Sequence, residues 1–231
     1  MKTELTSGNR AISRIGVIVI VAMLGMMAMV VLPALAMAKA KSTGIKCVNN
    51  LKHVGLGIRI AETDRPRDWS WWNASTNARS DAGRDDANQA WRHFAALSND
   101  VPDPRVFWCP TDTERVAAGS YTNRPGMNAG DVLSGNQQVS YFVGLGFASD
   151  DPSSIMSGDR NLTTNGVAVG PSTRLIRSAN WTVGWTDDGH QNVGNLLLGD
   201  GSVQQIMTPT LARAVMAMTN PGPRTNVWLV P

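Results

Sequence analysis

The sequence has few of the residues on which metal and redox centres depend, with only 2 Cys and 3 His among its 231 residues. These residues are scattered, so they do not show the ligand spacing of a zinc site. Charged residues make up only 17% of the chain, and its Lys and Arg residues are spread along it. Proteins that bind nucleic acids usually concentrate basic residues on one face. We therefore expect no nucleic-acid partner.

Patterns typical of catalysis are also missing from the sequence. No candidate nucleophile stands in a recognised strand-turn-helix context, and no glycine-rich phosphate-binding loop is present. The segment SGDRNL, residues 157–162, is interpreted as a turn in which Asp159 and Arg160 pair with neighbours. We expect no enzyme activity and no cofactor.

One long segment contains no charge at all, from Ile15 to Ala38. A helix of about 24 residues, rising about 1.5 Å per residue, is longer than the roughly 30 Å core of a bilayer. A cleaved signal peptide, a permanent anchor and a buried core helix could each produce this run. It exceeds the usual signal core of about 7–15 residues, and a soluble helix is seldom apolar on every face. The run favours a transmembrane helix over residues 15–38.

The helical pattern continues beyond the apolar run, and Pro66 ends it at the latest. Pro33, inside the run, should kink the helix. The two Cys and eight Trp suit an exported, turn-rich head. Apolar residues recur at steps of three and four in the second half of the helix, at Val48, Leu51, Val54, Ile58 and Ala61.

Six segments of the chain, in order, carry a family resemblance: LPALAMAKAKS, KCVNNLKHVGLGI, FWCPTD, SYFVGL, SGDRNL and HQNVGNLLLGDGSVQQ. They resemble the bacterial proteins with a prepilin-type N-terminal cleavage and methylation segment and a C-terminal His, nine residues, Asp-Gly motif, within the pseudopilin and type IV pilin superfamily. The resemblance implies an α+β, pilin-like fold, in which a long N-terminal helix packs on an antiparallel sheet. It also implies a leader-like segment at 1–11, a helix at 12–64 and a periplasmic head at 65–231.

Alignment of Pro33 with the proline of that family places the processing site between Ala11 and Ile12. The family usually has Gly before the cut and a Glu at the place of Gly16. That acid pairs with the N-terminal amine of a neighbouring subunit, because a carboxylate in apolar surroundings needs a cation. This chain has Ala11 and Gly16 instead.

The terminal motif consists of His190 and the pair Asp200 and Gly201. Asp-Gly between two strand-like runs predicts a two-residue type I′ hairpin turn, with Leu198 opposite Val203. His190 would then lie roughly 15–20 Å from Asp200, at about 3.3 Å per extended residue. We expect the histidine to hold a loop and not to share a metal or a proton with Asp200.

A local metal site is an alternative interpretation of Asp187, Asp188 and His190. Some pseudopilins that this chain resembles bind calcium in a loop of the head, and calcium takes six to eight oxygen ligands. A solvated turn explains the same residue types.

The remaining predictions concern cysteine and tryptophan. Cys47 and Cys109, the latter at the end of a predicted strand RVFWC, are expected to form a disulfide worth roughly 4 kcal/mol; the alternative is two buried thiols. The Trp-rich segment containing Trp69, Trp71 and Trp72 is either a binding patch or part of the core. Helices are predicted from near Asp86 and from Thr208, followed by a C-terminal strand in TNVWLV.

From these observations we expect a single-pass protein of the bacterial inner membrane, with a cytoplasmic N-terminus and a periplasmic head. By resemblance it is a pseudopilin-like subunit of a type II secretion or type IV pilus-like assembly. Its partners would be other pilin-like subunits, the secretion machinery and a prepilin peptidase. The alternative is an anchored binding module that does not polymerise and uses its Trp-rich loops on a glycan or a protein.

Overall fold

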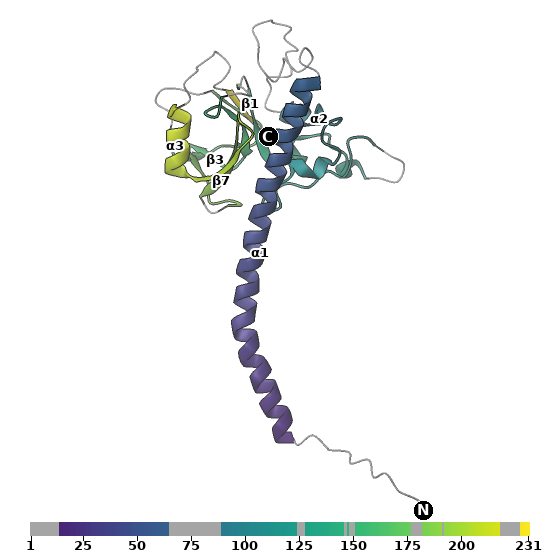
Figure 1. Ribbon diagram of the computed structural model, residues 1–231, viewed down its shortest axis with the longest axis vertical. Coiled ribbons are helices and arrows are strands. Elements are labelled where there is room, and N and C mark those ends of the chain that lie inside the picture. The colour runs from purple at the N-terminus through teal and green to yellow at the C-terminus, as the bar shows by residue number, and fades with distance from the viewer. Residues whose placement is uncertain are drawn as a thin grey trace, which may run out of the picture. The chain divides into compact units, whose positions relative to one another are not determined.

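The computed structural model describes residues 14–64, 89–123, 128–145, 147, 151–176, 182–190, 192–217 and 227–231. The chain divides into two compact units, Met1–Ser42 and Thr43–Pro231. Helix α1, Arg14–Asp64, contributes to both units (Figure 1). The predicted processing site and the segment with Trp69, Trp71 and Trp72 lie outside the described residues.

In the first unit, α1 is apolar from Ile15 to Ala38 and is not covered by other described residues. Every side chain from 17 to 42 is exposed, and Pro33 lies inside the helix. Within the described part of the chain, α1 is the one helix whose length and composition would allow it to cross a membrane. This agrees with the predicted span at 15–38 on length and composition alone.

The second unit combines helices with antiparallel sheets. A six-stranded sheet has the order β5-β9-β1-β2-β7-β8, and a three-stranded sheet has the order β4-β3-β6. The strands are β1 Tyr141–Leu145, β2 Ile155–Asp159, β3 Leu162–Thr164, β4 Val167–Ala168, β5 Thr173–Ile176, β6 Val183–Trp185, β7 Val193–Leu198, β8 Val203–Met207 and β9 Val227–Val230. The helices after α1 are α2 Ala90–Ala95 and α3 Thr208–Ala217, with 3₁₀ turns η3 Pro104–Phe107, η4 Ala129–Asp131 and η5 Asn136–Gln138.

Both faces of the six-stranded sheet are covered, with α1 on one side and α3 together with the three-stranded sheet on the other (Figure 1). Successive strand residues point to opposite faces. In β7, Leu197 joins the core beneath α1, whereas Leu196 and Leu198 join the core beneath α3. This double burial explains the three consecutive leucines, 196–198. The α1 side of the first core consists of Cys47, Leu51, Val54, Ile58 and Ala61.

Two local predictions are wrong. The RVFWC segment forms the 3₁₀ turn η3 and not a strand, because the Asp103 side chain accepts a hydrogen bond from the Arg105 backbone N–H and Pro104 occupies the first helical position. SGDRNL is not one continuous turn, because Asp159 ends the buried strand β2.

The other predicted elements are present in the part of the chain that the structure describes. Helix α2 is described from Ala90, after its N-cap Gln89. Helix α3 begins at Thr208 and buries Leu211 and Val215. Strand β9 occupies the VWLV part of the predicted C-terminal strand.

Candidate functional site

A disulfide joins α1 to the head. Cys47 on α1 is bonded to Cys109, which follows η3, and closes a loop with a sequence separation of 62. Two hydrogen bonds flank it: the Asn50 side-chain amide donates to the Trp108 carbonyl at 2.8 Å, and the Tyr141 hydroxyl donates to the Cys47 carbonyl at 3.3 Å. In the chain-entropy model a loop of this size contributes about 4 kcal/mol to stability.

His190 packs against this disulfide. Its Nε2 atom lies 2.9 Å from Thr111 Oγ1, 3.3 Å from Cys109 Sγ and 3.3 Å from Asp159 Oδ2. The loop that carries it is tightly turned: the His190 backbone N–H donates to the Asp188 carbonyl, and Gly189 and Asn192 have φ of +75° and +62°. The loop thus directs the imidazole inward, toward the disulfide.

Asp159 is a buried acid at the end of β2. Its Oδ2 accepts hydrogen bonds from the backbone N–H and the side-chain amide of Asn195, each at 2.8 Å. Among the described residues, its Oδ1 has no hydrogen-bond partner. Burial raises the pKa of Asp159 to about 7, although the bonds from Asn195 oppose the shift. Burial also lowers the pKa of His190, with the Asp112 charge opposing it. Burial therefore favours the neutral form of each partner.

The cluster does not have the geometry of a nucleophilic triad. In a Ser-His-Asp relay the acid binds one imidazole nitrogen and the nucleophile binds the other. Here Asp159 and Thr111 both approach Nε2 of His190. The neighbouring sulfurs are joined to each other and offer no thiolate.

The predicted calcium ligands do not come together with the histidine. Asp187 and Asp188 are exposed, and Asp187 Oδ1 accepts a hydrogen bond from the Asn192 side chain at 3.2 Å. Among the described residues, one group of three metal-capable side chains lies close together: Cys47, Cys109 and His190. Its two sulfurs form the disulfide, so this group is not a metal site in the oxidised protein.

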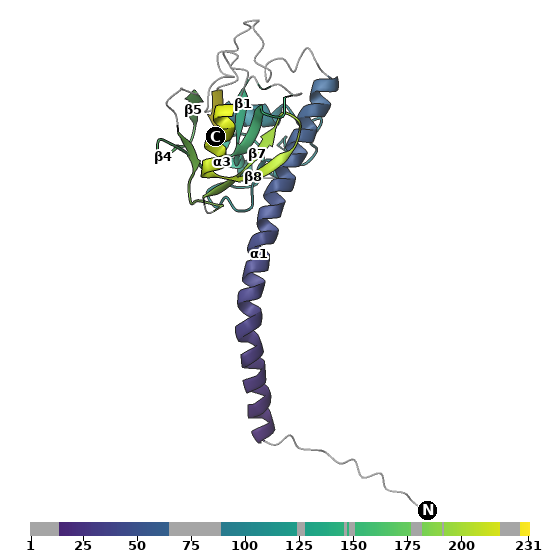
Figure 2. The ribbon, with the colours of Figure 1, turned by 60° about the vertical axis from the view of Figure 1, so that its left-hand side comes forward.

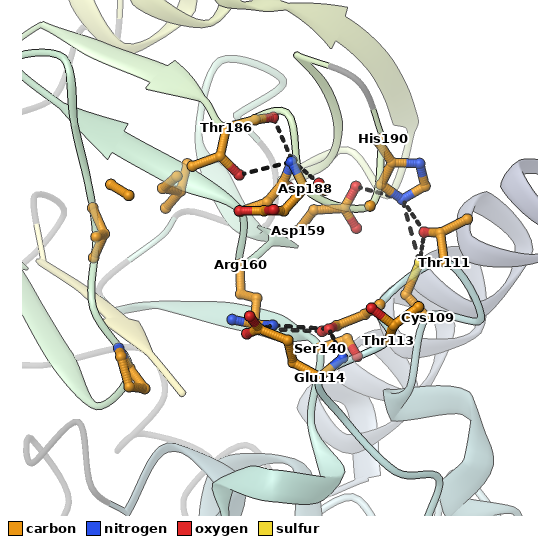
Figure 3. A pocket seen from close by; sticks show the side chains of 17 residues that line it. Cys109, Thr111, Thr113, Glu114, Ser140, Asp159, Arg160, Thr186, Asp188 and His190 are labelled. Carbon is orange, nitrogen blue, oxygen red and sulfur yellow. Dashed lines mark hydrogen bonds and ion pairs between the residues drawn. The ribbon is translucent and has the colours of Figure 1, made fainter.

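A cavity of about 270 Å³ opens beside the cluster (Figure 3). Arg160 stands in its wall and is held by two acids: its Nε and Nη2 contact both oxygens of Asp112 at 2.7 and 2.8 Å, and Nη2 also contacts Glu114 Oε2 at 2.6 Å. The prediction that Arg160 pairs with neighbours is confirmed. The other polar lining includes Thr111, Ser140, Asp159, Asn161, Thr186, Asp188 and His190.

The Asp-Gly end of the motif forms a different turn from the one predicted. The Leu198 N–H donates to the Ser202 carbonyl and the Gly201 N–H donates to the Leu198 carbonyl, so three residues form the loop. Val203 lies opposite Leu197 and not opposite Leu198. Of the three loop residues only Gly201 has a positive φ, +81°, as in hairpins that combine a turn with a glycine bulge.

This hairpin end binds α1 at a second point (Figure 2). Arg59 Nη2 donates to the Gly199 carbonyl at 2.8 Å. Between the two anchor points the strand lies close to the helix, since a Cβ on Gly55 would be 2.7 Å from Leu197 Cδ1. Cys47 and Arg59 are separated by about 18 Å of helix, and six extended residues of β7 span about 20 Å. The first end of the motif therefore lies near Cys47 and its second end lies at Arg59, and both residues belong to α1.

No protein-family model, curated protein or solved structure matches this chain.

Sequence reasoning missed several partners in the cluster. It singled out His190 but not Thr111 or Asn195, and it treated Asp159 as a turn residue. The FWCPTD segment could have indicated Thr111. This residue follows Cys109 so closely in the sequence that a disulfide at Cys109 places both residues beside His190. No pattern in the sequence identifies Asn195 as the partner of Asp159.

The buried acid predicts an unusual pH dependence of stability. Because the pKa of Asp159 is about 7 in the folded protein and near 3.8 when exposed, the folded state holds the proton more tightly. Its stabilising contribution is complete below about pH 4 and is lost as the pH rises to about 7, amounting to roughly 3–5 kcal/mol. Asp159→Asn should remove this slope in urea unfolding, followed by Trp fluorescence on the full chain in detergent.

Asp187→Asn is the matched control, since Asp187 is exposed in the turn before His190. It should leave the slope unchanged. An Asp159→Asn protein that still loses stability between pH 4 and 7 as steeply as the parent would contradict the assignment.

The contact between the β7–β8 hairpin and Arg59 predicts that substitution by alanine lowers stability by different amounts at two glycines. Gly201 and Gly166 have nearly equal φ, +81° and +79°, but a Cβ on Gly201 would lie 2.8 Å from Arg59 Nε, whereas a Cβ on Gly166 would have no described atom within 4 Å. Both Ala variants should carry a backbone cost of about 1 kcal/mol. Gly201→Ala should cost about 1 kcal/mol more, because the displaced Arg59 side chain loses its hydrogen bond to the Gly199 carbonyl. Equal free energies of unfolding for the two variants would rule out the Arg59 contact as a stabilising anchor.

Proposed function

We propose that this chain is a membrane-anchored, pilin-like protein that serves as a pseudopilin-like subunit of a type II secretion or type IV pilus-like assembly. The observation that carries the proposal is the division of α1 into two halves. Side chains 17–42 are all exposed, whereas the helix buries one face from Cys47 onward. A helix whose second half is built into a head and whose first half is apolar and uncovered suits a subunit anchored through that half.

The uncovered half requires an apolar environment. Fully burying one large aliphatic side chain is worth about 1.5–3 kcal/mol, and this half exposes many of them, among them Ile15, Val21, Met29 and Val30. Lipid can cover this surface, and so can the same surface of neighbouring subunits. In the proposed assembly it is covered first by lipid and then by other helices.

The disulfide supports the proposed location of the head. Disulfides persist in oxidising compartments such as the bacterial periplasm. The Cys47–Cys109 bond lies in the second unit, beyond the apolar half of α1. This order fits an inner-membrane protein with a cytoplasmic N-terminus and a periplasmic head.

The alternative is an anchored binding module that does not polymerise. Gly16 favours it, because the acid that pairs with a neighbouring subunit in the resembled family is missing here. The cavity beside His190 also favours it, since a head with its own binding site has a use without assembly.

Two measurements on membranes of the native host separate the candidates. First, the intact mass and N-terminal sequence should show a chain that begins at a methylated Ile12, because a small residue, Ala11, precedes the cut. Ala11→Arg is the control and should block processing, since the peptidase site accepts a small residue there. A parent chain that begins at Met1 would contradict processing and favour the permanent anchor.

Second, a photo-crosslinking residue at Val30 should yield covalent multimers of this chain, because the exposed apolar halves would cover one another. The same residue at Val167, exposed in β4 of the head, is the control for random collisions. Crosslinks from Val30 to lipid alone would contradict assembly and leave the binding module as the function.

A further inference from the structure

The fold brings three metal-ligating side chains together from separate parts of the head. Cys47 belongs to α1, Cys109 follows η3, and His190 precedes β7. Their two sulfurs and one ring nitrogen all lie within 4.8 Å of one another, and this is the one such group among the described residues. Figure 3 shows the imidazole directed toward Cys109. The fold therefore converges on a ligand set of two sulfurs and one imidazole.

A single atom already contacts all three ligand atoms. Thr111 Oγ1 lies 2.9 Å from His190 Nε2, 2.9 Å from Cys109 Sγ and 3.6 Å from Cys47 Sγ. The three ligand atoms therefore face a common point, as the ligands of a metal ion do. Rotation of the Thr111 side chain vacates this point for an ion.

The distances fit zinc once the two sulfurs are free to separate. Tetrahedral Zn²⁺ binds thiolate sulfur at about 2.3 Å and imidazole nitrogen at about 2.0–2.1 Å. A sulfur and a nitrogen on one ion therefore lie about 3.6 Å apart, and two sulfurs lie about 3.8 Å apart. The distance from Cys109 Sγ to His190 Nε2 is 3.3 Å. In the reduced chain no bond joins the two sulfurs, and rotation of the cysteine side chains allows them to separate.

We propose that the reduced head, before its disulfide has formed, binds one Zn²⁺ ion through Cys47 Sγ, Cys109 Sγ and His190 Nε2. Each thiol releases its proton to solvent as its sulfur binds the ion, so binding needs neither an oxidant nor a reductant. Water from the cavity that Cys109 and His190 line fills the fourth position. Two thiolates and an imidazole select zinc over calcium and magnesium, which take oxygen ligands.

The ion would give the reduced head the link that the disulfide gives the oxidised head. It would tie Cys47 on α1 to Cys109 and to the loop that carries His190. Structural zinc is taken up as a chain folds, because the unfolded chain has no preformed site, and so the burial of the sulfurs in the folded head does not prevent uptake. Formation of the disulfide would remove both thiolates from the ion. The site does not depend on whether the chain assembles.

Cobalt binding to the reduced full chain tests the proposal. The chain is unfolded in urea with dithiothreitol, separated from the reductant under anaerobic conditions and refolded in nonionic detergent with Co²⁺ as the probe. Cobalt bound by two thiolates should give sulfur-to-cobalt charge-transfer absorption in the near ultraviolet. Zn²⁺ should displace the cobalt with a Kd below about 1 μM. The oxidised chain should give no such absorption, and a reduced chain that gives none would overturn the proposal.

Two histidine variants test the third ligand. His190→Asn removes the ring nitrogen and should lower the Zn²⁺ affinity of the reduced chain at least about tenfold. His53→Asn is the matched control, because His53 is exposed on α1, and it should leave the affinity unchanged. Equal affinities of the parent and His190→Asn would mean that the two cysteines hold the ion without the histidine and would overturn the assignment.

The stability of the parent chain provides a readout that does not depend on any variant. Zn²⁺ should raise the urea midpoint of the reduced chain and leave that of the oxidised chain unchanged, because only the reduced chain offers thiolates to the ion. Trp fluorescence in detergent measures both midpoints. An equal rise in the two forms would show a site outside the cysteines and overturn the proposal.

Discussion

Helix α1 packs its Cys47–Ala61 face against the six-stranded sheet, and the first core of the head forms around that contact. The contact needs a close approach, which Gly55 permits by leaving room for Leu197. It also has a covalent bond at one end and the Arg59 hydrogen bond at the other. Strand β7 serves both cores, so a shift of the helix along the sheet would disturb α3 as well. The second half of α1 is thus an internal element of the head.

The His, nine residues, Asp-Gly motif has a geometrical explanation in this arrangement. Its histidine supports the disulfide, its glycines allow the backbone to approach Arg59, and the residues between them form β7. The residues of β7 within the spacer span about 20 Å, close to the about 18 Å of helix between Cys47 and Arg59. The motif joins helix to sheet, and the polar cluster at its first end lines a cavity. Asp159 and His190 belong both to the polar cluster beside the disulfide and to the wall of the cavity. The protonation of Asp159 therefore affects the stability of the head and the charge of the cavity together.

Much of the fold could be predicted from periodicity, but hydrogen-bonded turns could not. The helical spacing of Leu51, Val54 and Ile58 identified the buried face of α1, because a three- to four-residue repeat admits few alternatives. The Asp-Gly pair was assigned the wrong hairpin, while the two-residue turn with positive φ at both positions occurs at Asn165 and Gly166, between β3 and β4. Asp159 was placed in a turn because Gly-Asp-Arg is polar, and its burial depends on Asn195 from a distant strand, which no local pattern encodes.

Hydrogen–deuterium exchange of the full chain in detergent tests most directly whether α1 is part of the core of the head. Amides of residues 47–61 should be as protected as those of β7 and should exchange only when the head unfolds, because both belong to one core. Residues 47–61 exchanging as fast as an exposed helix, while β7 remains protected, would contradict the account: the head would then fold without its helix, and the motif would not be an anchor.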